Sequence, residues 1–220
     1  MDENYWQLGT WRRIPVAMHW TVLLVFAWLY FIFSDLLATV IASAAFFVLL
    51  VVHEMGHVAV LRRRKIAVES ITFYGIHGRT SHGFASQPDE ILVAWGGVGA
   101  QALVLVAALA FAYVVDLPSI PLAGLIAGPI LFTFIKLNIF LMIVALLPIG
   151  PFDGRSAWAA IPYVRSALRR RKRAAQEIAR FPEKGLSPER RRELEESSAK
   201  AAEDLLGKFS KKPDSRKEDA

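Results

Sequence analysis

The chain alternates long uncharged runs with short clusters of charge. Residues 14–34 form an uncharged run of 21, and residues 91–115 form another of 25. Residues 36–61 are equally apolar except for two histidines and one glutamate, and a fourth apolar segment, residues 125–147, is interrupted only by Lys136. As a helix, each segment is long enough to cross a bilayer core of about 30 Å. The pattern predicts four transmembrane helices.

Between the second and third apolar segments, residues 66–85 are more polar. Short runs of β-favouring residues are broken there by Gly75, Gly78 and Gly83, which is typical of a β-hairpin. The predicted fold class is therefore an α-helical polytopic membrane protein, with about four transmembrane helices and a small cytoplasmic β-hairpin after the second. Residues 14–158 form its transmembrane core.

Residues 159–220 have a different composition. From residue 165 to the end of the chain there are 17 Lys or Arg and 11 Asp or Glu, with few large apolar side chains. We predict a charged cytoplasmic tail, helical or disordered. A helix is expected over residues 188–206, between Ser187 as its cap and Gly207 as its stop. This tail is a candidate contact for a cytoplasmic partner or a second copy of the chain, and its basic run for anionic lipid headgroups.

Charge is distributed unequally between the connections of the predicted helices. The connections after the first and third helices contain only Asp35 and Asp116, whereas basic clusters flank the other ends. These clusters are Arg12 and Arg13, residues 62–65 and residues 165–173. Basic residues concentrate on the cytoplasmic side of membrane proteins. We therefore predict that both termini, including residues 1–13, are cytoplasmic, and that the first helix is an uncleaved anchor.

Five consecutive residues of the second apolar segment, His53-Glu54-Met55-Gly56-His57, form an HExxH pattern. On a helix the two histidines project from one face, one turn apart, and can bind one zinc ion together. Glu54 points to the flank of that face, where its carboxylate can take a proton from water at the metal. Because ionisable groups inside a bilayer are costly unless paired or metal-bound, we predict a Zn²⁺ site. The alternative is a buried His and Glu network that only links helices.

A hydrolytic zinc site usually has three protein ligands and one open position. The chain has no cysteine, so the third ligand must supply nitrogen or oxygen. Asp153 is the best candidate, because it lies in a segment, residues 147–154, whose two prolines and two glycines break the fourth helix. Irregular backbone at membrane depth is found where it lines a polar cavity. The third predicted ligand is therefore Asp153.

The two motifs together resemble the site-2 protease family of intramembrane metalloproteases, in which HExxH on one span is completed by an aspartate in an LPxxPxDG segment on a later span. The match here is LLPIGPFDG, and the resemblance covers roughly residues 13–158. It implies that His53, His57 and Asp153 hold Zn²⁺ and that Glu54 activates water. The implied reaction is hydrolysis of a peptide bond in or next to a transmembrane segment of a membrane-protein substrate, near the cytoplasmic face. We expect a prokaryotic cell membrane and no nucleic-acid partner.

The sequence departs from the family pattern at two places. Ala145 stands where family members commonly carry an asparagine, and the GPxxN segment of the third span appears as residues 97–101, with Gln101 in place of asparagine. A side-chain amide near the metal can stabilise a developing oxyanion, so Gln101 and the retained Asn138 are candidates for oxyanion or substrate support. The alternatives are a non-proteolytic zinc-binding scaffold or regulator, and a zinc transporter.

Three further histidines and one lysine are candidates for function. His19 lies in the first predicted span, where an interhelical hydrogen bond is a commoner role than metal ligation. His77 and His82 lie in the predicted hairpin, where an accessory metal or pH-sensing site is the alternative to ordinary exposed histidines. Lys136 lies near the middle of the fourth span and has no partner that the sequence identifies.

Overall fold

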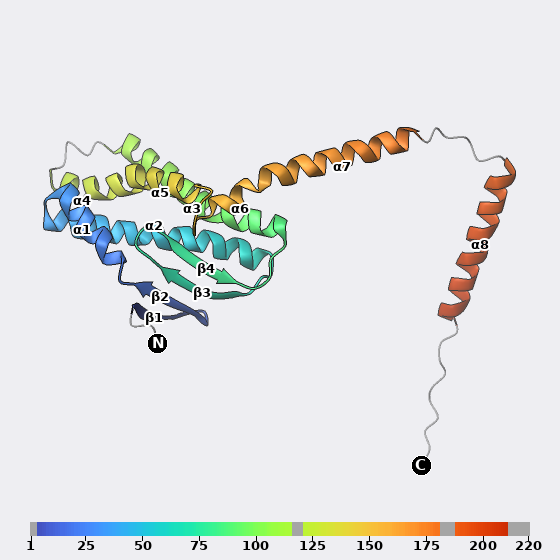
Figure 1. Cartoon of the computed structure of the whole chain (residues 1–220), viewed down its shortest axis with the longest axis horizontal. Coiled ribbons are helices and arrows are strands. Elements are labelled where there is room, and N and C mark those ends of the chain that lie inside the picture. The colour runs from blue at the N-terminus through green and yellow to red at the C-terminus, as the bar shows by residue number, and fades with distance from the viewer. Residues whose placement is uncertain (1–3, 116–120, 181–187, 211–220) are drawn as a thin grey trace, which may run out of the picture. The chain divides into compact units, whose positions relative to one another are not determined.

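A computed structural model of the chain describes residues 4–115, 121–180 and 188–210 (Figure 1). The chain divides into two compact units, Met1–Arg165 and Ser166–Ala220. The described strands and the long apolar helices all belong to the first unit. Two residues named in the sequence analysis, Asp116 and Ser187, lie outside the described residues.

Among the described residues, three helical segments are long and apolar enough to cross a membrane, by length and composition. They correspond to the second, third and fourth predicted spans. The segments are α2 (Leu36–Arg63), α3 (Gln87–Val114), and a continuous run of α4 (Pro121–Leu131), the π-helix η2 (Phe132–Leu137) and α5 (Asn138–Ala145). Helix α2 begins where the sequence pattern places it, because the Asp35 side chain accepts a 2.7 Å hydrogen bond from the backbone N–H of Ala38.

The first predicted span, residues 14–34, differs from the structure. Its first part is the strand β2 (Ile14–His19), and only α1 (Val22–Phe33) is helical. With 12 residues, α1 is about 18 Å long, shorter than a bilayer core. Uncharged residues fit a strand as well as a helix, and β2 is paired on both sides, with β1 (Tyr5–Trp11) and with β3 (Val68–Phe73). Four spans therefore stay a prediction.

The predicted hairpin is present and belongs to a larger sheet. Strand β3 pairs antiparallel with β4 (Gly78–His82), and the sheet order is β1-β2-β3-β4, with β2 and β3 parallel. The buried side chains of Ile71 and Phe73 join the same apolar core as Leu49 and Val58 of α2. The N-terminal residues, predicted as a plain cytoplasmic segment, supply β1.

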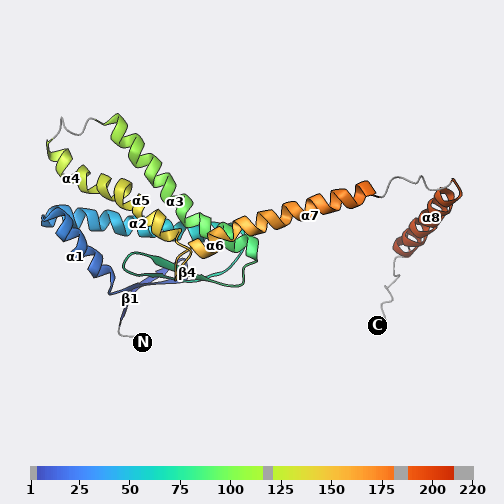
Figure 2. The same cartoon turned by 45° about the horizontal axis from the view of Figure 1, so that its top comes forward.

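Helix α2 is the centre of the first unit (Figures 1 and 2). It contacts α1, β3 and β4 as well as α3, α4 and η2. The HExxH motif lies on α2 between the sheet and α3, so side chains from several elements surround it.

The second unit contains most of α7 (Ala160–Arg180) and all of α8 (Pro188–Ser210). Helix α8 begins at the residue that the sequence predicts. It continues through Gly207 instead of ending there, which is compatible with the modest cost of glycine inside a helix, about 1 kcal/mol relative to alanine.

Candidate metal centre

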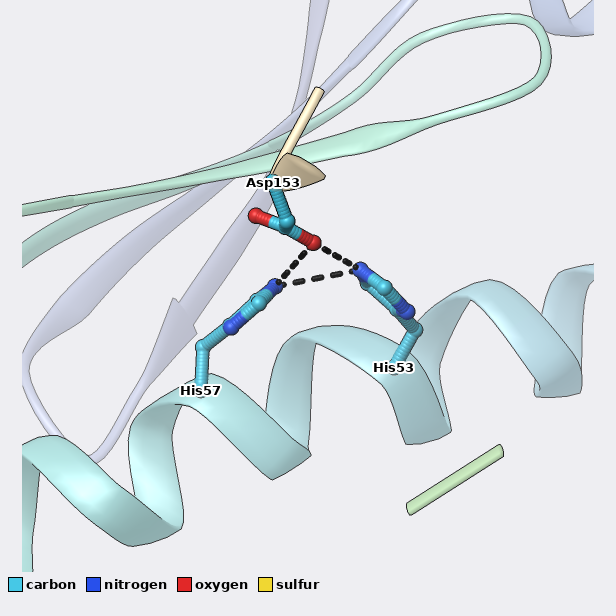
Figure 3. Close-up of side chains that lie close together, drawn as sticks. All are labelled: His53, His57 and Asp153. Atoms are coloured by element: carbon cyan, nitrogen blue, oxygen red, sulfur yellow. Dashed lines mark hydrogen bonds and ion pairs between the residues drawn. The ribbon is translucent and has the colours of Figure 1, made fainter. Parts of the chain in front are cut away.

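The structure brings His53, His57 and Asp153 together (Figure 3). Nε2 of His53 lies 3.0 Å from Nε2 of His57 and 3.0 Å from Oδ2 of Asp153, and Nε2 of His57 lies 3.2 Å from the same oxygen. Ligands placed tetrahedrally at zinc bond lengths are about 3.3 Å apart. The three atoms therefore have the spacing of a ligand set converging on one ion.

The far nitrogen of each imidazole has a buried acceptor. Nδ1 of His53 donates to Oε1 of Gln101 at 3.0 Å, and Nδ1 of His57 donates to the backbone carbonyl of Val93 at 2.7 Å. These bonds place the ring proton on Nδ1, which leaves the lone pair of each Nε2 pointing at the other ligands. Gln101 and Val93 both belong to α3, so α3 orients both histidines.

Two glycines of α3 allow this close approach. A Cβ at Gly97 would lie 2.7 Å from atoms of both His53 and His57, and a Cβ at Gly96 would lie 2.7 Å from the carbonyl oxygen of Gly56. The same holds in reverse, because a Cβ at Gly56 would overlap the backbone of Gly96. A glycine inside the HExxH motif therefore has a packing role, as close contact between small residues predicts.

Asp153 lies in the tight segment between α5 and α6 (Gly154–Trp158). A Cβ at Gly154 would overlap the carbonyl groups of Leu146 and Leu147, so the turn requires glycine there. Burial raises the pKa of the Asp153 carboxyl, but His53 and His57, when protonated, more than offset burial and hold that pKa well below its usual range. Asp153 is thus an anion at neutral pH, as a metal ligand must be.

Glu54 is almost fully buried, with 1% of its surface exposed. Its Oε2 accepts a 2.6 Å hydrogen bond from the Thr80 hydroxyl of β4, and its carboxylate packs against Gly78. Its Oε1 has no hydrogen-bond partner among the described residues. Because an unpartnered buried carboxylate oxygen is costly, the site suits a water molecule there.

Two cavities border the three candidate ligands. The first, of about 30 Å³, is mainly apolar and has room for one or two waters. The second, of about 370 Å³, is polar and also reaches Glu54. The first is lined by His53, Leu50, Ile76, His77, Gln101, Leu141, Val144, Ala145 and Phe152, and the second by His57, Arg79, Thr80, His82, Glu90 and Ser156. Asp153 borders both.

The two predicted support residues have different positions. Gln101 borders the smaller cavity, and its carbonyl oxygen is used by His53. The Asn138 amide donates to the backbone carbonyls of Gln101 at 3.0 Å and Phe134 at 3.3 Å, and Asn138 does not line either cavity. Asn138 therefore positions α3 against α5. Ala145 borders the cavity with only a methyl group.

Thr80 and His77 border the two cavities, a position that the sequence does not predict for either residue. The His77 ring stacks on Tyr74 with centroids 4.9 Å apart, lies edge-on to Phe152 at 5.7 Å, and borders the smaller cavity. The sequence contains one signal for each residue. Alternation along a strand places Thr80 on the same face as Gly78, and the aromatic partner of His77, Phe152, is the residue before the predicted ligand Asp153.

The other candidates lie away from the ligand set. His19 is in β2, where its Nδ1 is 2.9 Å from the Thr21 hydroxyl and its ring packs near Tyr5 and Tyr74. His82 lies 3.8 Å from a carboxylate oxygen of Glu90. Lys136 is exposed in η2, and its Nζ is 5.9 Å from the Phe132 ring centroid. Among the described residues, the one metal-binding group found is His53, His57 and Asp153.

No protein-family model matches the chain, and no curated protein matches it. Its structure is similar to the solved site-2 protease from Methanocaldococcus jannaschii, with a TM-score of 0.59 and 22% sequence identity, over 71% of this chain and 71% of that one. At this identity the likeness is one of fold. With three apolar helices of spanning length, the protein is an integral membrane protein. The resemblance to the site-2 protease family, which the two sequence motifs indicate, is confirmed at the level of the fold.

Proposed function

We propose that this protein is a zinc-dependent endopeptidase that cleaves a membrane-protein substrate in or next to a transmembrane segment. One observation carries the proposal: two histidines in the same tautomer and one carboxylate converge at 3.0 to 3.2 Å. Beside them lies a buried glutamate with a free carboxylate oxygen. A network that only linked helices would have no need of either feature. His53, His57 and Asp153 would hold the ion.

The residues around the site would divide the work of peptide hydrolysis. Zn²⁺, when bound, would polarise the substrate carbonyl and make water more acidic. Glu54 would take the proton from the water that attacks the carbonyl carbon, and would give it to the departing amine. Thr80 would keep the carboxylate in place through Oε2. Gln101 and the Val93 carbonyl would keep the two histidines in the ligating tautomer.

The substrate would approach along β4. Among the described strands, β4 is at the edge of the sheet and pairs only with β3. Gly78 borders both cavities, and Thr80 borders the polar one. An extended peptide can pair with a free strand edge through its main chain, which would bring one peptide bond beside Glu54 and Asp153. Under the predicted topology, this edge is near the cytoplasmic face.

The proposal is tested by cleavage assays on the detergent-purified protein with a panel of candidate membrane substrates. Glu54→Gln should retain zinc and lose activity by roughly 10²- to 10⁴-fold, because it removes proton transfer. Asp153→Asn should lose zinc as well. Glu69→Gln, at an exposed carboxylate of β3, is the matched control and should behave as wild type. Cleavage that survives both site changes would show that the proposal is wrong.

One observation favours a second candidate, a non-proteolytic zinc-binding scaffold or regulator. The smaller cavity has a methyl group at Ala145, where an amide would stabilise an oxyanion. Removing such a donor elsewhere costs about 3–4 kcal/mol of transition-state stabilisation. The scaffold predicts stoichiometric zinc without turnover over the whole substrate panel. Ala145→Asn distinguishes the two, since it should raise cleavage in a protease and produce none in a scaffold.

A further inference from the structure

Helix α7 exposes a stripe of large apolar side chains. Ile161, Val164 and Leu168 have 44%, 52% and 59% of their surface exposed. Their spacing of three and four residues places them on one face of the helix, and Ala175 continues that face two turns later. An apolar stripe this exposed on a charged helix requires something to cover it.

The rest of α7 is strongly basic. Its 21 residues include seven Lys or Arg and a single acid, Glu177. The basic residues are Arg165, Arg169, Arg170, Arg171, Lys172, Arg173 and Arg180. The five consecutive ones, residues 169–173, are all exposed. They wind around the helix beside the stripe. A helix that combines one apolar face with a basic remainder is typical of a membrane-surface helix.

The beginning of α7 lies close to the end of the last apolar helix. The indole N–H of Trp158 donates a 2.7 Å hydrogen bond to the carbonyl of Leu146, one residue beyond α5. A second tryptophan, Trp95, donates to the Ala157 carbonyl at 3.2 Å. Tryptophan is enriched at the headgroup level of membranes. Because α7 starts two residues after Trp158, its first turn is placed at the bilayer surface.

We propose that α7 is an interfacial helix that binds anionic phospholipids, with Val164 and Leu168 entering the acyl boundary and residues 169–173 contacting the headgroups. Charge complementarity and the short distance along the chain from the last apolar helix both favour a lipid surface over a soluble protein partner. Each basic residue near an anionic surface strengthens binding by roughly fivefold. This lipid site is separate from the proposed peptidase activity and does not depend on it.

The absence of cysteine from the chain permits a direct test in the full-length protein. A polarity-sensitive fluorophore is attached to Leu168→Cys, or to Ser166→Cys on the opposite face of α7 as the control. Each protein is reconstituted into two kinds of nanodisc. One contains phosphatidylcholine alone, and the other contains phosphatidylcholine with about a third of phosphatidylglycerol, an anionic lipid. The Leu168 probe should shift to the blue in anionic discs and be quenched by doxyl-labelled lipid. The Ser166 probe should do neither.

The charge requirement is tested by replacing the five basic residues 169–173 with glutamine. The fraction of inserted Leu168 probe should then fall at least fivefold, and high salt should have the same effect on the unaltered helix. Replacing Arg192 and Lys200 of α8 by glutamine is the control and should leave the signal unchanged. If the Leu168 probe reports a polar environment in both bilayers, the proposal is overturned and the stripe is assigned to a protein partner. The proposal is also overturned if the Leu168 probe inserts equally in both bilayers and equally after residues 169–173 are replaced by glutamine.

Discussion

The hydroxyl of Thr80 donates a 2.6 Å hydrogen bond to Oε2 of Glu54, and this bond joins the edge strand β4 to the helix that carries both histidines. Gly78, on the same face of the strand, is so close to Glu54 that a side chain there would overlap the carboxylate. The sheet therefore fixes the proposed general base from one side. The other oxygen, Oε1, is buried and has no hydrogen-bond partner among the described residues.

Thr80→Val keeps the shape of the side chain and removes its hydroxyl. We expect cleavage to fall by roughly tenfold and the free energy of unfolding by about 1–3 kcal/mol, because a buried carboxylate loses its donor. Thr80→Ser restores the donor and should recover most of the activity. Zinc content should be unchanged in both variants. The variants are compared by steady-state cleavage, thermal melts and metal analysis. Equal activity of the valine and serine variants would contradict the role of the Thr80 hydroxyl as a donor to Glu54.

The sequence predicts well what depends on local chain geometry. His53 and His57 are one helical turn apart on any helix, so their shared face follows from the spacing alone. The break around Asp153 is likewise contained in a short run of proline and glycine. Three of the four long apolar segments are helices of spanning length. The candidate ligand set therefore could be predicted without a structure.

The features that the sequence did not predict depend on contacts between distant residues. Strand β2 pairs in parallel with β3, through Val16 and Ile71 for example, and nothing in the apolar run 14–34 distinguishes that pairing from a helix. The role of Thr80 likewise follows from the position of β4 beside α2. The bond between the side-chain oxygen of Gln101 and Nδ1 of His53 is a further contact of this kind, and oxyanion or substrate support by Gln101 stays a prediction.

Gly97→Ala tests the close approach of α3 to the two histidines. The added Cβ would lie 2.7 Å from ring atoms of His53 and His57, so the rings must shift. We expect zinc affinity to fall by at least tenfold, measured by competition with a chelator. Gly99→Ala is the matched control, because no atom lies within 4 Å of its Cβ position. If both variants retain zinc equally, the packing argument fails.

Gln101→Leu removes the acceptor of the His53 Nδ1 proton. Loss of such a partner typically lowers metal affinity by about 10- to 100-fold, since the ring is no longer fixed in the ligating tautomer. Gln101→Glu keeps a carbonyl-type acceptor and should lose less. The chelator competition used for Gly97 provides the measurement. If the leucine variant bound zinc as tightly as wild type, the bond to His53 would not matter for metal binding, and substrate support would be the remaining role of Gln101.

His77 gives the protein a predicted sensitivity to acid. Burial lowers the pKa of His77 below its ordinary 6.5, against a smaller opposing effect of the Asp153 charge. The unfolded chain therefore binds this proton more tightly than the folded one. The stability from burying neutral His77 is fully present above about pH 6.5 and decreases as pH falls below that value toward the folded pKa.

We therefore expect the melting temperature of metal-free protein in detergent to fall between pH 7.5 and pH 5.5, and to fall less in His77→Phe. Phenylalanine keeps an aromatic ring against Tyr74 and Phe152, whose ring centroids lie 4.9 and 5.7 Å from that of His77. Working without zinc removes the contribution of metal release, and both proteins contain His53 and His57. The difference between the two pH dependences thus isolates His77. Identical decreases would mean that protonation of His77 does not oppose folding.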